Sequence, residues 1–477
     1  MVQFTPLPQE MVRSRAYGIR LKGKDGWISA EAYECRVSAM PFNREWPGKQ
    51  RPLEQTELSA WCFFRMDEPV ELELQVEEPF SEAVIRPLSR GVALHREGQT
   101  LRFTLDRPGF FTVELDGIHR VLQLFACPFE RYDVEKDDPG VLYYAAGMHT
   151  VGDLRLKSGQ TLFLEDGAVL RGGVAVDQGA NVRILGGGVI DNSREERENS
   201  LFKMNAPGCV KAMRASNIEL RGPVLLDSAV WTASFFGCDN VLIEQIKAVG
   251  MWRYNSDGID LCNCTNCVVR DCYLRCFDDV IVLKGLKGWD ERNVENITVS
   301  GCVLWCDWGR NLEIGAETCA DHYRNILFRD CDLIHSCHMN MDLHCGDRAD
   351  VHDILFEDIR VEYSRHTMTP VYQSSDETTY DGSEGWMPQL LYSCHYCGRW
   401  SQDNIMGKSH DIHFRNITVY TDDGLPLPPS GFNGADEEHL CSDITIRGLR
   451  INGRALQSDA DYPMSNNAFA RNIHVLP

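Results

Sequence analysis

The chain has 477 residues, of which 43% are hydrophobic and 25% charged, as in an ordinary globular protein. Its 70 acidic and 48 basic residues give a net charge of −22, which argues against a nucleic-acid partner or an anionic membrane surface. Because no apolar run approaches the ~20 residues of a membrane-spanning helix, we expect no membrane partner. The oligomeric state does not follow from the sequence.

The N-terminal part of the chain predicts a small antiparallel β-sandwich. Apolar and polar residues alternate over 70–76, 101–105 and 111–115, a short apolar run covers 83–85, and turn residues separate the segments. Such short alternating segments are typical of half-buried strands in a sandwich. We take residues 1–140 as an N-terminal domain and residues 141–477 as a second domain.

The second domain contains an internal repeat. Each copy begins with Asn or Asp and has apolar residues at +1, +3, +6 and +8. The clear copies begin at Asn240, Asn266, Asn296, Asn325, Asp353, Asp411 and Asp443, and weaker copies begin at Asn181 and Asn217. The step from Asp353 to Asp411 is about twice as long as the others, so it hides either an extra coil or an insertion.

The repeat predicts an all-β solenoid, a right-handed parallel β-helix. Alternation at +1 and +3 is strand-like, and the change of parity between +3 and +6 implies a bend between two short strands. A regular period of this kind, built from such strands, indicates a solenoid. A leucine-rich repeat is excluded because its Leu-x-x-Leu-x-Leu pattern is absent, whereas an ordinary all-β domain stays open as an alternative.

An insertion near residues 364–409 interrupts the repeat and is rich in Tyr, Trp, Ser, Gly and Asp. Insertions in solenoids often collect on the binding face, where aromatic rings could stack on sugars. Equally, the aromatic residues of this loop could pack against the helix itself.

The cysteines favour a reducing compartment. Cys272, Cys302 and Cys331 share the +6 column with aliphatic residues, so we read them as small buried hydrophobes. The N-terminus shows no secretory signal, and we expect a cytoplasmic protein with reduced thiols. Cys394 and Cys397 have the spacing of half a zinc site, but no second pair with matching spacing stands near them, so we expect neither a metal nor a cofactor.

Three acids carry the chemistry. Asp257 precedes the pair Asp278–Asp279 by a little less than one repeat of the chain, so the three carboxylates should meet on neighbouring coils. An isolated Asp-Asp is most simply a polar turn, but three acids in register repel one another, which raises a pKa as a general acid requires. Glycosidases use a pair of carboxylates held on a rigid surface to cleave the glycosidic bond.

The sequences Asn-Ser-Asp-Gly-Ile-Asp at 255–260 and Asp-Asp-Val-Ile-Val-Leu-Lys at 278–284 resemble those of glycoside hydrolase family 28, the polygalacturonases. The resemblance implies a right-handed parallel β-helix and inverting hydrolysis of an oligo- or polysaccharide. By position, Asp278 would be the general acid, Asp257 and Asp279 would hold and deprotonate the water, and Lys284 would sit beside the sugar.

The chain departs from this family in two places. The Gly-His-Gly turn is missing, and Gly315-Ala316-Glu317 stands in the nearest corresponding turn. The Arg-Ile-Lys segment that grips a uronate is also missing, and Arg348 is the nearest candidate along the chain. Hydrolysis is therefore better supported than a galacturonan substrate. A β-sandwich ahead of a β-helix also resembles the family 49 dextranases, which act on neutral glucans.

We expect further substrate contacts around the acids, and exo action on short plant-type or pectic oligosaccharides. A lyase that uses Lys284 as its base and a non-catalytic carbohydrate-binding β-helix remain alternatives. The predicted substrate-binding residues are Lys284, Glu317, Arg348, His344, Trp252 and Arg253, and weaker candidates are His322, His338 and Glu313.

Overall fold

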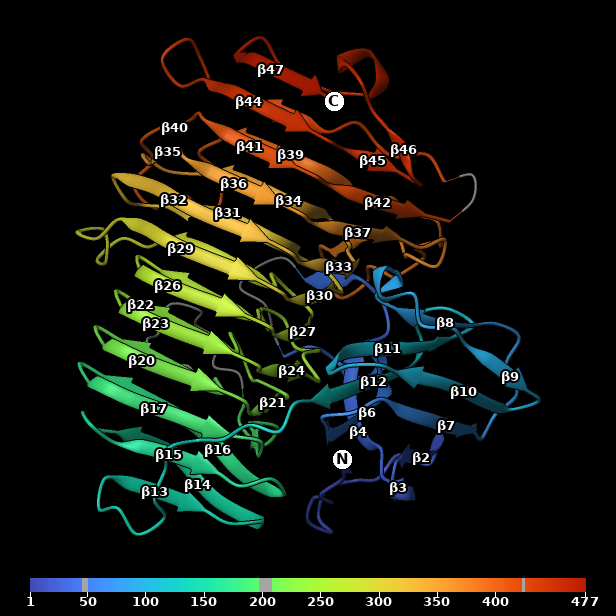
Figure 1. Cartoon of the computed structure of the whole chain (residues 1–477). Coiled ribbons are helices and arrows are strands. Elements are labelled where there is room, and N and C mark those ends of the chain that lie inside the picture. The colour runs from blue at the N-terminus through green and yellow to red at the C-terminus, as the bar shows by residue number, and fades with distance from the viewer. Residues whose placement is uncertain (45–49, 197–207, 423–424) are drawn as a thin grey trace.

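The computed structural model describes residues 1–44, 50–196, 208–422 and 425–477, and this part of the chain is built from strands with no α-helix. Figure 1 shows a tall stack of coils with a smaller unit packed against its side. No helix among the described residues is long and apolar enough to cross a membrane. The described residues include three 3-10 turns, at Leu53–Gln55, Leu88–Arg90 and Asp459–Asp461.

The smaller unit consists of two sheets that enclose one apolar core. Strands predicted at 70–76, 101–105 and 111–115 are confirmed as β7 (Val70–Val76), β10 (Thr100–Leu105) and β11 (Gly109–Leu115). All but one of the strand pairs in this unit are antiparallel, the exception being β12 (Arg120–Cys127) on β6 (Thr56–Met66). One sheet contains β1 (Val2–Gln3), β4 (Tyr33–Ser38), β6 (Thr56–Met66), β8 (Ala83–Arg86), β11 (Gly109–Leu115) and β12 (Arg120–Cys127). The other contains β2 (Tyr17–Gly23), β3 (Gly26–Ala30), β7 (Val70–Val76), β9 (His95–Glu97) and β10 (Thr100–Leu105).

The tall stack is a right-handed parallel β-helix with three faces, as the repeat predicts. The first face contains β13 (Val141–Tyr144), β15 (Thr161–Leu164), β17 (Ala180–Gly186), β20 (Ser216–Arg221), β23 (Asp239–Glu244), β26 (Thr265–Arg270), β29 (Val294–Ser300), β32 (His322–Arg329), β35 (Asp350–Val351), β36 (Ile354–Glu357), β40 (Lys408–Ser409), β41 (Ile412–Arg415), β44 (Cys441–Arg447) and β47 (Ala470–Leu476).

The other two faces diverge from the long strands β14 (Gly147–Leu156) and β16 (Ala168–Asp177). The second face continues with β18 (Val189–Asp191), β21 (Val224–Leu226), β24 (Lys247–Val249), β27 (Tyr273–Cys276), β30 (Val303–Cys306), β33 (Asp332–His335), β37 (Arg360–Tyr363), β42 (Thr418–Thr421), β45 (Arg450–Ile451) and β46 (Arg454–Ala455). The third face contains β19 (Val210–Met213), β22 (Ala233–Phe236), β25 (Ile259–Cys262), β28 (Ile281–Gly285), β31 (Arg310–Thr318), β34 (Met339–Cys345), β39 (Gln389–His395) and β43 (Gly431–Asn433).

The repeated Asn or Asp has a backbone role. Asn266 has φ of 56° and Asn296 has φ of 59°, and every other repeat-starting residue is likewise left-handed. Asn and Asp tolerate this conformation better than other residues that carry a Cβ. Nδ2 of Asn296 donates to Oδ1 of Asn266 at 2.9 Å, and Asn325 donates to Asn296 at 2.6 Å. The stacked amides form what we call the Asn ladder.

The bend between +3 and +6 is confirmed. Asp271, at +5 of its copy, has φ of 53° and separates β26 on the first face from β27 on the second. The long step from Asp353 to Asp411 contains an insertion and no extra coil, because β36 pairs directly with β41.

That insertion reaches the N-terminal unit. Its strand β38 (Val371–Gln373) pairs in parallel with β5 (Phe42–Arg44), so two segments far apart in the chain lie side by side. Elsewhere Arg86 binds the carboxylates of Glu114 and Glu362, and the ring of Tyr273 packs on Phe125. The division into domains at residue 140 stays a prediction; the change from antiparallel to parallel pairing falls between β12 and β13.

All nineteen cysteines are unpaired thiols in this structure. Those of the +6 column, Cys272, Cys302 and Cys331, are fully buried in the β-helix core, as predicted. On other coils the same position holds an aliphatic side chain, so these thiols act as small core hydrophobes. This role explains how thiols can be frequent without forming disulfides.

Candidate active site

The three predicted acids converge at one edge of the third face. Asp257 lies just before β25 and Asp278–Asp279 just before β28, and these strands pair with Ile259 opposite Ile281. The same turn therefore occurs on neighbouring coils, about 4.8 Å apart. All three carboxylates line one cavity of about 410 Å³. Its other lining residues are Asn43, Arg44, Trp231, Tyr254, Asn255, Lys284, Trp308, Arg310, Glu313, Ala316, Glu317, Tyr372, Ser374, Arg399 and Trp400.

Lys284 fixes one side of Asp257. Its Nζ lies 2.8 Å from Oδ2 of Asp257 and 2.9 Å from Oδ1 of Asp260, and all three side chains are buried. Oδ1 of Asp257 is also buried but accepts no hydrogen bond from any described residue. Asp257 thus has one oxygen held by the ammonium group and one whose capacity to accept a hydrogen bond is unused.

The turn beside the Asp pair on the next coil is Gly309–Arg310–Asn311. The backbone N–H of Arg310 donates to Oδ1 of Asp279 at 3.1 Å, and a Cβ on Gly309 would lie 2.7 Å from Oδ1 of Asp278. Only glycine leaves room there for both carboxylates. The expectation that Gly315-Ala316-Glu317 is the corresponding turn is therefore wrong, because those residues follow Leu312, which pairs with Ile281 beyond the acids.

Arg310 sits among carboxylates. Its Nε lies 3.1 Å from Asp342 and 3.8 Å from Glu313, and its Nη1 lies 3.8 Å from Asp279. The pairing of β31 with β34 puts Glu313 opposite Asp342, so this cluster continues the acidic column for two more coils. The guanidinium compensates part of the negative charge that stacking creates.

Burial and mutual repulsion raise the pKa values of Asp257, Asp278 and Glu313. Burial is the main cause for Asp257, whose pKa rises to about 6 with help from Asp279 although Lys284 opposes it. Burial, then Asp279 and Asp257, raise the pKa of Asp278 well above its usual value. Burial and Asp279 likewise raise the pKa of Glu313. A carboxyl that keeps its proton near neutral pH can serve as a general acid.

Aromatic rings and the N-terminal unit complete the cavity. The Nζ of Lys284 lies 4.0 Å from the ring centroid of Trp231, and Tyr372 meets Trp308 edge to face at 4.8 Å. Tyr372 belongs to the insertion and Arg44 to the N-terminal unit, both from the β5–β38 pair. The aromatic residues of the insertion therefore reach the cavity, and one of them also packs against the β-helix.

The predicted binding residues divide into two groups. Lys284 and Glu317 line the cavity with the acids. His344 does not line it but is close enough for the Arg310 charge to act on it, since burial and then Arg310 lower its pKa to about 4. Trp252 donates its indole N–H to Asp227 at 2.8 Å, and Arg253 lies 3.5 Å from the same carboxylate, away from the lining.

Arg348 does not line the cavity. Its guanidinium contacts Asp403 at 2.7 Å and both Asp290 and Asp321 at 3.3 Å. The prediction that it would replace the missing uronate-binding segment is therefore not supported, because its donors already have three carboxylate partners. His322 is also outside the lining and belongs to a cluster described below.

Sequence reasoning missed Arg310, Trp231, Tyr254 and the contribution of residues 43 and 44. One signal was available for Arg310, which follows Asp279 at a spacing close to the repeat period and so returns to the same edge. No local signal marks Asn43 or Arg44, because their place depends on a pairing with a distant strand.

Comparison with known proteins supports the resemblance. The profile "Glycosyl hydrolases family 28" matches residues 166–365, which include both acidic motifs, so the resemblance predicted from the motifs is confirmed over this segment. A probable polygalacturonase of Vitis vinifera is 32% identical over 94 residues, 20% of this chain and 19% of that protein. The matched segment thus spans about a fifth of that relative.

One solved structure extends the likeness to the whole fold. Dex49A from Penicillium minioluteum is similar over 99% of this chain and 96% of its own, with a TM-score of 0.68 and 13% identity. The predicted arrangement of a β-sandwich ahead of a β-helix is thus shared by that structure. A hyperthermoactive exopolygalacturonase from Thermotoga maritima is similar over 70% of this chain and 83% of its own, with a TM-score of 0.47 and 16% identity.

Proposed function

We propose that this chain is a glycoside hydrolase that cleaves a glycosidic bond by inversion. The observation that carries the proposal is the convergence of Asp257, Asp278 and Asp279 in one cavity that aromatic rings also line. Buried carboxyls with different environments can divide the roles of acid and base between them.

In the proposed reaction Asp278 is the general acid. Its raised pKa keeps the proton on the carboxyl until the leaving oxygen takes it, and Asn255 steadies its other oxygen from 3.4 Å. Asp257 and Asp279 accept hydrogen bonds from the attacking water and remove its proton. Oδ1 of Asp257 is suited to this role, since Lys284 holds only Oδ2. Inversion requires the acid and base carboxyls to stand ~6.5–9.5 Å apart.

The surroundings of Lys284 argue against the lyase alternative. Burial alone lowers the pKa of a lysine, but Asp257 and Asp260 more than offset burial and raise the pKa of Lys284 well above its usual value. A base must be neutral before it can abstract a proton. An ammonium group held by two carboxylates is suited to positioning Asp257.

We propose a short oligosaccharide with a neutral sugar at the cleavage site, and exo action. Among the cations that line the cavity, Lys284 and Arg310 already contact carboxylates of the protein and Arg44 pairs with Asp376, so these three offer little to a uronate. The insertion and the N-terminal unit both line the cavity, which favours a chain end over a long polymer. The buried thiols fit our further proposal of a reducing, cytoplasmic location.

The test is product analysis with aryl glycosides and with neutral and uronate oligosaccharides. We expect one new reducing end per cleavage, of inverted anomeric configuration by proton NMR, and greater activity on the neutral series. Asp278→Asn should abolish turnover, whereas Asp153→Asn, on the exposed surface, serves as the matched control. An ultraviolet-absorbing unsaturated sugar from the uronate oligosaccharides would indicate a lyase. Retained configuration would exclude inversion, and brisk depolymerisation of polygalacturonate would overturn the neutral-sugar proposal.

A further inference from the structure

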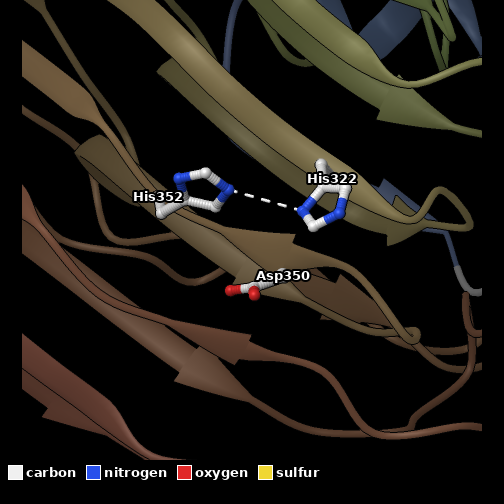
Figure 2. Close-up of side chains that lie close together, drawn as sticks. All are labelled: His322, Asp350 and His352. Carbon is white, nitrogen blue, oxygen red and sulfur yellow. Dashed lines mark hydrogen bonds between the residues drawn. The ribbon is translucent and has the colours of Figure 1, made fainter.

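A cluster of histidines and one aspartate lies on the first face, apart from the residues that line the cavity. His322 begins β32 and pairs in register with Asp350 of β35, and His352 follows two residues after Asp350. Since residues two apart in an extended strand share one face, the three side chains come together on neighbouring coils. Figure 2 shows the two rings turned toward each other with the carboxylate beside them.

The ligand atoms have the spacing of a metal site. One atom from each residue lies within 4.8 Å of the other two. Nε2 of His352 lies 3.4 Å from Nδ1 of His322, which is long for a hydrogen bond. Two nitrogens each ~2.05 Å from a tetrahedral Zn²⁺ lie about 3.4 Å apart, so the rings need little movement to share one ion.

A second observation points to a ligand. Oδ1 of Asp350 is buried yet has no hydrogen-bond partner of suitable geometry among the described residues, while its Oδ2 lies 3.3 Å from Nζ of Lys408. Nε2 of His410 lies 3.0 Å from Oδ1, within ion-pair distance, although the geometry is not that of a hydrogen bond. Oδ1 thus has an ion-pair neighbour but no well-directed hydrogen bond, which leaves it free to turn toward a cation held between the two histidines.

The outer contacts prepare the histidines as ligands. Nδ1 of His352 lies 2.7 Å from Oδ2 of Asp353, which fixes a proton on Nδ1 and leaves the lone pair of Nε2 directed at His322. Metal-binding histidines characteristically donate their other N–H to a carboxylate in this way. Asp411 holds His410 similarly at 2.6 Å, and its ring stacks on that of His352 at 5.2 Å.

A second group of potential ligands behaves differently. Asp347, close to Cys319 and Asp403, accepts backbone hydrogen bonds from Thr318, Gln402 and Asp403. Its oxygens are therefore already satisfied by the turns it joins, and this group braces the loops without needing an ion.

We propose that His322, Asp350 and His352 bind one Zn²⁺ ion, with water as a fourth ligand, and that the ion joins two coils. Imidazole nitrogens and a carboxylate form a ligand set that suits Zn²⁺ better than Ca²⁺ or Mg²⁺. The position has structural value because the coil that follows is interrupted by the 364–409 insertion. The ion is not a reactant in the proposed hydrolysis.

The test is calorimetric titration of the metal-stripped protein with Zn²⁺, together with its thermal unfolding. We expect one ion per chain and a rise in Tm of about 3 °C at about a hundredfold excess over Kd. His322→Gln and His352→Gln should each weaken binding at least tenfold. His95→Gln, a change on the exposed strand β9, should leave binding unchanged.

The absorption spectrum of bound Co²⁺ distinguishes this site from binding to any of the nineteen thiols. Co²⁺ bound here should give visible bands of a nitrogen and oxygen site without the near-ultraviolet charge transfer of a thiolate. Absence of binding, binding unaffected by both histidine changes, or a thiolate spectrum would each overturn the proposal. If a variant fails to fold, the Co²⁺ spectrum of the unchanged protein still shows whether nitrogen and oxygen ligands or thiolates bind the ion.

Discussion

The first and third faces of the β-helix use the same stacking with opposite electrostatic results. On the first face, neutral Asn side chains repeat from coil to coil, and Asn325 donates to Asn296, which donates to Asn266. On the third face the repeated side chains are carboxylates that repel one another, and burial with this repulsion raises the pKa values of Asp257 and Asp278. The same stacking of coils can therefore bring together either kind of identical group. The stacked amides stabilise the fold, whereas the stacked acids lower its stability and give the site its reactivity.

The largest effect should come from Asp278→Asn. We expect kcat to fall by at least ~10³-fold, because amide nitrogen cannot donate the proton that the leaving oxygen needs. Unfolding free energy at pH 8 should rise by about 1–2 kcal/mol, since the change removes a repelling buried acid. Denaturant unfolding measures the free energy of unfolding, and single-turnover assays measure the rate of cleavage. A variant that keeps full activity would eliminate Asp278 as the acid.

The sign of the pH dependence sharpens this prediction. A carboxyl whose pKa is raised by folding favours the folded state at low pH, and this contribution is lost as pH rises through the raised pKa. The stability gained by Asp278→Asn should therefore be larger at pH 8 than at pH 5. An equal gain at both pH values would show that repulsion and burial do not act on this group.

The pH profile of the hydrolysis should be bell-shaped. Activity should fall about tenfold per pH unit below about 6, as Asp257 takes up a proton and stops accepting one from water. It should fall again at higher pH as the acid Asp278 loses its proton. The limbs describe the coupled group of acids, so Asp278→Asn should remove the alkaline limb from whatever activity survives. A profile flat from pH 4 to 9 would contradict the assignment.

The Asn ladder gives a stability effect without an activity effect. Asn296→Ala should lower the free energy of unfolding by about 2 kcal/mol, because alanine disfavours φ of 59° and removes amide hydrogen bonds. Asn296→Gly keeps the backbone conformation accessible and should cost about 1 kcal/mol. Equal losses in both variants would assign the whole effect to the amide ladder. Chemical denaturation measures the free energy of unfolding of each variant, and kcat, which should not change, serves as the control.

The smallest effect should follow Arg348→Ala. This residue pairs with three acids outside the cavity lining, so we expect KM to change less than about twofold and stability by about 1 kcal/mol or less. Assays on both the neutral and the uronate oligosaccharides provide the comparison. A sharp rise in KM for the uronate series alone would restore Arg348 as a carboxylate-binding residue.

The sequence by itself determined the regular part of this protein. The repeat predicts the coils because each begins at a residue that tolerates a left-handed backbone and then alternates toward the core, and both properties are local. The spacing of Asp257 and Asp278 predicts their meeting for the same reason, since one repeat of chain returns to the same edge.

Only the tertiary structure decided what surrounds the acids. The β5–β38 pair brings Arg44 to the cavity from a separate unit, and Arg348 turns to carboxylates outside it. The cluster of His322 with Asp350 likewise depends on the register of two strands. These placements rest on contacts between segments far apart in the chain, whose partners no local periodicity specifies, whereas the coils repeat a single local rule.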